Sequence, residues 1–190
     1  FYGAQVTSVY LNNNGSVSIG APYSTFTADS FPSNQYSMIA PFWGDVDTRD
    51  PGSGLVYYQL TSSHLIVQWE DVGYYNTMSD KKNTFQLIMT DGIDQLLPPN
   101  ANVSFCYKDM AWTTGAASGG VGGFGGIPAT VGINQGNGTD YIQIGRFDTV
   151  GTQYDGPYGN VDGIDFLDNQ QFILNSCLSG SNVPPILNSQ

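Results

Sequence analysis

Four charged residues crowd into six positions in the stretch Asp-Val-Asp-Thr-Arg-Asp, which begins at Asp45. Asp45, Asp47 and Asp50 supply carboxylate oxygens, the ligands that calcium prefers in proteins. The spacing departs from the EF-hand pattern, because Arg49 stands at the fifth position and no closing glutamate follows. Two interpretations therefore stay open. One is a loose calcium site, and the other is a turn whose carboxylates accept backbone N–H groups or pair with Arg49.

A second group of aspartates lies in the stretch YDGPYGNVDGIDFLD near the C-terminal end. Its members are Asp155, Asp162, Asp165 and Asp168. Calcium ligation and hydrogen bonding to backbone N–H groups are again the two interpretations, because the spacing imposes few constraints.

Residues for hydrolytic catalysis are scarce. His64 is the only histidine and lies inside a strand-like segment, so a zinc site and a Ser-His-Asp triad are both disfavoured. Glu70 is the only glutamate, and its neighbour Asp71 would point to the opposite face of a strand. The two carboxylates therefore cannot flank one glycosidic bond. The sequence predicts a protein that is not an enzyme, and a surface or edge position for His64.

The charge balance excludes several partners. The chain of 190 residues has a net charge of −11 with five basic residues, and Lys81, Lys82 and Lys108 do not form a patch. Nucleic acid and anionic membrane surfaces are therefore not expected as partners. No run of 18 apolar residues is present, so membrane insertion is not expected either.

The two cysteines, Cys106 and Cys177, bear on the cellular compartment. Few lysines and many asparagines, glycines and tyrosines are typical of secreted or cell-surface β-proteins. We therefore predict one disulfide, closing a loop of about 70 residues and stabilising the fold by roughly 4 kcal/mol. Two reduced, buried cysteines are the alternative. Three glycosylation sequons begin at Asn14, Asn102 and Asn137, and two of them contain the Asn-Gly pair of a hairpin turn.

Period-two alternation between glycines and prolines predicts an all-β fold, either an antiparallel β-sandwich or a flattened barrel. The expected strands are 5–11, 16–20, 54–60, 64–72, 83–90, 102–110, 129–134, 140–147 and 170–178. The glycine-rich segment 118–126 is expected to be a long flexible loop, because no helix follows its G-x-G-x-x-G pattern. We assign residues 1–178 to one domain and residues 179–190 to an extended C-terminal tail or linker.

Several segments together resemble the nidogen-like (NIDO) extracellular domain family. IAPFWGDVDTR followed by GLVYY is similar to the family signature, with Phe42, Trp43, Asp45, Asp47 and Arg49 at its centre. VYLNNNGSVSIG, FPSNQYSMIAPFW, LIVQWEDVGYYN, NTFQLIMTDG and NVSFCYKDMAWTTG resemble further parts of the family in the same order, from about Val6 to Gly138. The resemblance implies an extracellular, non-enzymatic β-domain with no catalytic residues. It also implies a structural role for the signature, with Phe42 and Trp43 as core anchors.

Two functions follow as hypotheses. The first is a structural or adhesive glycoprotein domain that associates with itself, by strand addition of residues 1–11 or 182–190 into filaments, or with matrix partners. The second is a calcium-assisted, lectin-like glycan-binding module in an adhesin. It would use the aspartates and the tyrosines at or near loops, which are Tyr57, Tyr58, Tyr74, Tyr75, Tyr154 and Tyr158. The first requires no cofactor. Calcium and N-linked glycans are optional additions.

Overall fold

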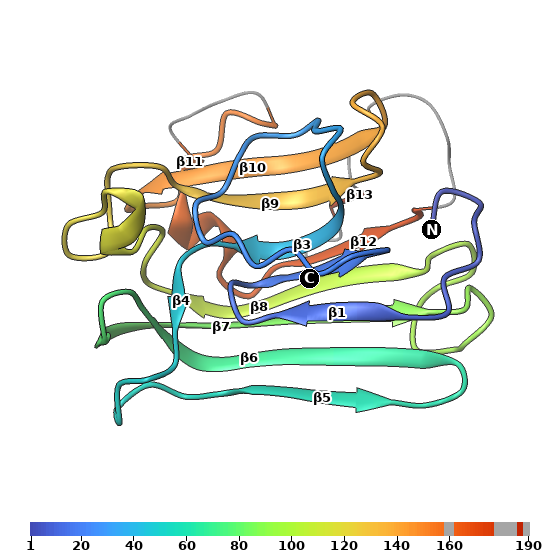
Figure 1. The fold of residues 1–190 in the computed structure, drawn as a ribbon, viewed down its shortest axis with the longest axis horizontal. Coiled ribbons are helices and arrows are strands. Elements are labelled where there is room, and N and C mark those ends of the chain that lie inside the picture. The colour runs from blue at the N-terminus through green and yellow to red at the C-terminus, as the bar shows by residue number, and fades with distance from the viewer. Residues whose placement is uncertain (158–161, 177–185, 188–190) are drawn as a thin grey trace.

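Two β-sheets pack on each other to form the molecule (Figure 1). The computed structural model describes residues 1–157, 162–176 and 186–187. Each sheet is open, with a different strand at either end of its order, so the fold is a β-sandwich and not a closed barrel. Within the described residues, only the pairing of β10 with β11 is parallel. The predicted all-β antiparallel sandwich is therefore confirmed.

The first sheet has the strand order β1-β2-β3-β9-β10-β11. Its strands are β1 (Val9–Asn12), β2 (Ser16–Ile19), β3 (Ser37–Trp43), β9 (Ala129–Asn134), β10 (Tyr141–Thr149) and β11 (Asp162–Gly163). The second sheet has the order β13-β12-β8-β7-β6-β4, and β5 pairs with β6 beside β4. Its strands are β4 (Val46–Asp47), β5 (Val56–Leu60), β6 (His64–Tyr74), β7 (Met78–Thr90), β8 (Val103–Met110), β12 (Gln171–Leu174) and β13 (Ile186–Leu187).

Two 3₁₀ turns complete the described elements, η1 (Ala116–Ser118) and η2 (Ile164–Leu167). Within the described residues, neither η1 nor η2 is long and apolar enough to cross a membrane. The strand β3 does not alternate between apolar and polar residues, because six of its seven residues are buried on one face or the other. A strand covered on both sides shows no polar period, and its pattern therefore did not predict it.

Phe42 of β3 lies at the centre of the main core between the sheets. Its ring centroid is 5.4 Å from that of Phe85 on β7 and 5.5 Å from that of Trp112, which follows β8. Phe85 in turn stacks on Trp69 of β6 at 5.0 Å. All four rings are at most 1% exposed. Such aromatic pairs contribute beyond their buried area, so this group joins the two sheets firmly.

Trp43, one residue later, points to the opposite face of the first sheet, as strand geometry requires. A second hydrophobic cluster surrounds it there, formed with Ala28, Phe31, Tyr36, Met38 and Ala40. Its indole Nε1 donates a hydrogen bond of 2.8 Å to the carbonyl of Thr25. The segment between β2 and β3 is thereby held over the outer face of the sheet. Both residues of the signature pair are core anchors, in two different cores.

The turn between β1 and β2 needs glycine at its end. Gly15 has a φ of +78°, and a Cβ placed there would lie 1.7 Å from the carbonyl oxygen of Phe42. The indole of Trp69 donates to the carbonyl of Asn13 at 3.0 Å, which ties this turn to the second sheet. The Asn-Gly pair thus acts as the hairpin turn that the sequence predicts.

The glycine-rich segment forms turns with regular backbone hydrogen bonds. The carbonyl of Gly123 accepts from the N–H groups of Thr113 and Thr114, and Val121 forms a bridge with Phe124. Most of the predicted tail 179–190 lies outside the described residues. Ile186–Leu187, within it, pairs antiparallel with β12.

Replacing Phe42 with alanine should lower the free energy of unfolding by about 3–5 kcal/mol, because the change empties the centre of the main core. Denaturant titration followed by tryptophan fluorescence measures this loss. Val121→Ala is the matched control, because Val121 is 86% exposed and its truncation should change stability by less than about 0.5 kcal/mol. Equal effects of the two substitutions would contradict the assignment of Phe42 to the core.

Candidate functional site

Asp47 accepts four hydrogen bonds at one end of the sandwich. Its Oδ1 accepts from the backbone N–H and the Nε of Arg49, at 3.0 and 2.8 Å. Its Oδ2 accepts from the Nη2 of Arg49 and from the backbone N–H of Thr77, at 2.5 and 3.0 Å. The Arg49 hydrogen bond is the main reason that the pKa of Asp47 falls to about 2. The guanidinium also lies over the ring of Tyr75, 5.3 Å from its centroid.

Asp50 closes the turn that follows. Its Oδ1 accepts from the backbone N–H of Gly52 at 2.7 Å and from the hydroxyl of Ser79 at 2.6 Å. The Ser79 contact comes first among the causes that lower the pKa of Asp50. Asp47 therefore ties the end of β4 to Thr77 in the turn between β6 and β7, and Asp50 ties the loop after β4 to Ser79 at the start of β7.

Asp45 differs from its two neighbours because it is buried without a full set of partners. It is 4% exposed, and its Oδ2 has no hydrogen-bond partner. Burial raises its pKa to about 6, against the opposing effect of the backbone N–H groups of Ala117 and Ser118. The carboxylate also lies against Gly115, where a Cβ would be 2.5 Å from Oδ2. Asp45 thus packs under η1, apart from the Asp47 and Asp50 contacts.

Within the described part of the chain, no three His, Cys, Asp or Glu side chains lie close enough to hold a metal ion. The three aspartates of the stretch point to different partners, as described above. Calcium binding by Asp45, Asp47 and Asp50 stays a prediction that calorimetry would check.

The C-terminal aspartates also contact backbone N–H groups. Asp162, fully buried, accepts from Asp155 and Arg146 at 3.1 and 3.3 Å. Asp165 accepts from Gly151 at 3.0 Å, and Asp168 accepts from Met110 at 2.9 Å. Burial is the main cause that raises the pKa of Asp162 to about 6, and the neighbouring Asp155 adds to it. Each of these three carboxylates fixes a loop.

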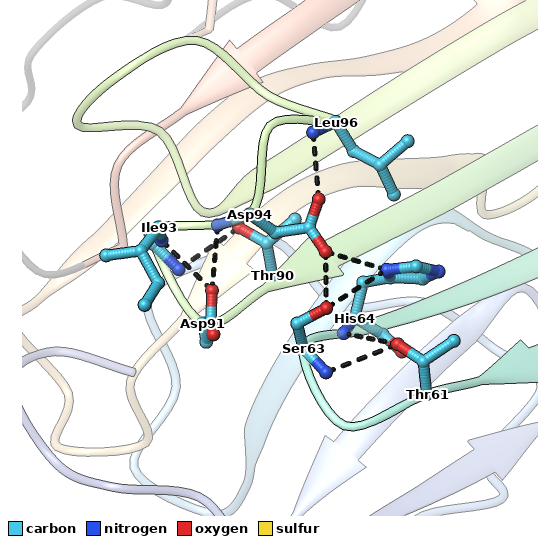
Figure 2. Close-up of polar contacts among 9 residues, drawn as sticks. Thr61, Ser63, His64, Thr90, Asp91, Ile93, Asp94 and Leu96 are labelled. Carbon is cyan, nitrogen blue, oxygen red and sulfur yellow. Dashed lines mark hydrogen bonds and ion pairs between the residues drawn. The ribbon is translucent and has the colours of Figure 1, made fainter.

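The structure brings together Ser63, His64 and Asp94, a group that the sequence did not reveal (Figure 2). The hydroxyl of Ser63 donates to Oδ2 of Asp94 at 2.5 Å, and Nδ1 of His64 lies 2.8 Å from the same oxygen. Asp94 comes from the loop after β7, whereas Ser63 and His64 form the end of the β5–β6 turn. Nothing in the spacing of 30 residues signals this contact.

The three residue types are those of a hydrolase triad, but their order in space differs. In a triad the serine contacts one imidazole nitrogen and the carboxylate contacts the other. Here Ser63 and the carboxylate share one side of the ring, and the hydroxyl proton is directed to Asp94. Hydrogen bonds from Ser63, His64 and the N–H of Leu96 lower the pKa of Asp94 to about 2. The group holds the 91–96 loop against the β5–β6 turn and has no activated nucleophile.

The predicted sequons differ in exposure. Asn137 is exposed, although its Nδ2 contacts Gln135 and Asp140. Asn14 is half-buried and donates to the carbonyl of Ser24, whereas Asn102 donates to the hydroxyl of Ser176 at 2.9 Å. Glycosylation at Asn14, Asn102 and Asn137 stays a prediction, and Asn137 offers the most open attachment point.

The predicted disulfide involves a residue that the structure does not describe. Cys106 is half-buried on β8, with its Sγ 3.6 Å from the hydroxyl of Ser104. Among the described residues it has no partner cysteine. Cys177 lies outside them, and the Cys106–Cys177 bond stays a prediction.

Exposed apolar side chains gather where the edge strands β1 and β5 lie. Tyr57, Tyr58 and Leu60 of β5 are 52%, 67% and 69% exposed. A groove of about 1000 Å³ runs beside them, and its lining includes Val9 and Leu11 of β1. Of the other predicted tyrosines, Tyr74 is buried, Tyr75 and Tyr154 are half-buried, and Tyr158 lies outside the described residues. Only the β5 pair therefore offers open rings among the described residues of that set.

Comparison with known proteins points to one family. The model of the nidogen-like domain matches residues 7–66 and 61–155. Mouse alpha-tectorin (Mus musculus) is 34% identical over 174 residues, covering 76% of this chain and 8% of the relative. Nidogen of Drosophila melanogaster is 27% identical over 147 residues, covering 63% of this chain and 10% of the relative. Dendrite extension defective protein 1 of Caenorhabditis elegans is 24% identical over 209 residues, covering 95% of this chain and 16% of the relative.

The chain therefore spans less than a fifth of the length of each of these three relatives. No solved structure matches it. The matched region includes β1 to β10, and with them the Phe42 core and the loop that Asp47 organises.

Asp47→Ala should lower the free energy of unfolding by about 1–3 kcal/mol, because it leaves the N–H of Thr77 and the guanidinium without their acceptor. Arg49→Ala should lower it by less than about 1 kcal/mol, since the Arg49 side chain is 62% exposed and the Thr77 bond survives. Urea denaturation of both variants measures the two losses in the free energy of unfolding. A larger loss for Arg49→Ala would contradict this account of the loop.

Acidification from pH 7 to about pH 5 should raise the free energy of unfolding. Asp45 and Asp162 have folded pKa values of about 6, above an unfolded value near 3.9, so the folded state binds protons in this window and the unfolded state does not. We expect a gain of about 1–3 kcal/mol from the two groups. Asp45→Asn should remove about half of this pH dependence. Thermal melts across the range check it, and a flat profile would contradict the assignment.

Proposed function

The chain belongs to the nidogen-like domain family, an extracellular family, and from this premise we propose that it is a non-enzymatic structural or adhesive domain of the extracellular matrix or cell surface. The observation that carries the proposal is the family match across residues 7–155, which covers most of both sheets. Two relatives, alpha-tectorin and nidogen, are 34% and 27% identical to this chain over 76% and 63% of its length.

The chemistry of the described residues supports the non-enzymatic part of the proposal. Catalysis needs a nucleophile beside a base, or carboxylates that face one cleft. The Ser63 hydroxyl donates to a carboxylate that is itself shared with His64. The oxygens of Asp47 and Asp165 accept hydrogen bonds from backbone N–H groups, and those of Asp47 also accept from Arg49. These carboxylates are therefore already engaged in structural contacts.

The finer part of the proposal is that the domain associates with copies of itself as well as with matrix partners. A β-sandwich with open edges can add a strand from a neighbour, because main-chain N–H and C=O groups remain unpaired there. Both terminal segments contribute edge strands here, β1 in the first sheet and β13 in the second. The edge strand β1 contains no Asp, Glu, Lys or Arg, which favours such contacts although the net charge of the chain is −11.

A second candidate function is glycan binding. The exposed rings of Tyr57 and Tyr58 favour it, because open aromatic faces stack on sugars. A glycan array probed with and without a chelator tests this candidate, and an array without hits would remove it.

The purified chain should form oligomers or ordered filaments as its concentration rises, because the open edges of both sheets are free to pair. Sedimentation velocity over a range of concentrations, with electron microscopy of the same samples, measures this. Deletion of residues 181–190 removes β13, and deletion of residues 1–5 removes the segment before β1; each should weaken the assembly if that terminal segment carries it. A chain that stays monomeric at every concentration would overturn self-association, and unchanged assembly by both deletions would overturn assembly through these two terminal segments.

A further inference from the structure

The strand β5 is an edge strand with one unpaired side. Within the described part of the chain it pairs with β6 alone, in the register Val56 opposite Trp69 to Leu60 opposite Leu65. The carbonyl of Leu55 accepts from the N–H of Glu70, and the N–H of Thr61 donates to the carbonyl of His64. In an antiparallel pair such bonded positions alternate, so the odd-numbered residues of β5 face β6. The N–H and C=O groups of Val56, Tyr58 and Leu60 therefore face the free edge.

This edge lacks the features by which proteins prevent strand pairing. The sequence Val-Tyr-Tyr-Gln-Leu contains no lysine, no proline and no charged side chain, and its pairing with β6 shows no bulge. Both faces carry exposed apolar groups. Tyr58 and Leu60 lie on the face that lines the groove beside β1, and Tyr57 lies on the other. An uncharged, unprotected edge strand of this kind is a template for another strand.

Charge favours a second copy of this chain as the partner. Residues 51–69 and 1–28 contain no Asp, Glu, Lys or Arg, although the chain as a whole has a net charge of −11. Two copies can therefore approach through this edge with little repulsion. The nearest acids stand beyond the two ends of β5, Glu70 beside Leu55 and Asp94 beside Ser63 and His64. Antiparallel pairing brings the Leu55 end of one copy beside the Thr61 end of the other, so these acids flank the paired strands, and the residues that pair, Val56 to Leu60, carry no charge themselves.

We propose that the free edge of β5 pairs with the free edge of β5 in a second copy, antiparallel and centred on Tyr58, to give a closed two-fold dimer. The strand is complementary to itself in this register. Tyr58 stands opposite its own counterpart, and Val56 stands opposite Leu60, each pair exchanging both main-chain hydrogen bonds. Tyr57 meets Gln59 on the other face. The cross-strand pairs are thus aromatic with aromatic and aliphatic with aliphatic. This inference rests on the proposed self-association and names its surface.

Cysteine cross-linking of the full chain tests the register. In the proposed dimer the two Cα atoms of residue 58 are about 5.5 Å apart, within disulfide range. Tyr58→Cys should form a covalent dimer under mild oxidation at least tenfold faster than Tyr57→Cys, the matched control whose residue stands opposite Gln59. The unsubstituted chain gives the background from its own cysteines. Equal rates for positions 57 and 58 would overturn the register.

Sedimentation equilibrium tests the edge itself. Tyr58→Pro removes the central outward N–H while leaving the bonds between β5 and β6, and Leu60→Lys places a charge on the edge. Each should raise the dimer dissociation constant at least tenfold. Val121→Lys, at an 86% exposed loop position away from β5, should leave it unchanged. Thermal melts establish that each variant is folded, and Leu60→Lys decides the matter if Tyr58→Pro does not fold.

The outcomes separate the two proposals. Association that persists in folded Tyr58→Pro and Leu60→Lys would overturn the β5 edge and leave self-association standing. A chain that is monomeric at every concentration would overturn both. Loss of association in these variants alone, with cross-linking at position 58, supports the dimer.

Discussion

The inward placement of Phe42 is the constraint on which the other features depend. It joins the sheets through Phe85 and Trp112, and the alternation of the strand then sends Trp43 into a separate cluster on the outer face. The chain leaves the first sheet at Trp43 and pairs in the second sheet from Val46 onward. Phe42 and Trp43 fix the start of this short crossing between the sheets by packing in their two cores. The hydrogen bonds of Asp47 fix its end in the second sheet.

Carboxylates in this protein act mainly as hydrogen-bond acceptors for backbone N–H groups that are not paired within a β-sheet. Asp47, Asp50, Asp165 and Asp168 each accept an N–H group in a loop or at a strand end. A buried N–H without a partner destabilises a fold, and a charged acceptor forms a stronger bond than a neutral one. Asp45 differs from these four, because its burial under η1 leaves Oδ2 without a hydrogen bond. The same residue type therefore gives opposite pKa shifts within three positions.

The edges of the sandwich have a different chemistry from its loops. Charged side chains lie on β6, β7, β8 and β10 and in the loops, whereas β1 and β5 carry none. A net charge of −11 keeps copies apart over most of the surface, and the uncharged edges remain as places for close contact.

The sequence by itself determined the all-β class, most strands and the family, because period two and turn residues are local signals and the FWGDVD stretch is specific. It did not determine β3, whose burial on both faces removes the alternation. Tertiary structure alone decided which acceptors meet which donors. Asp94 contacts His64, which lies 30 residues earlier in the sequence, and the N–H of Thr77 donates to Asp47 across the same sequence separation. It also decided that β5 is an edge, since strand order arises from sheet packing and not from the pattern of any one strand.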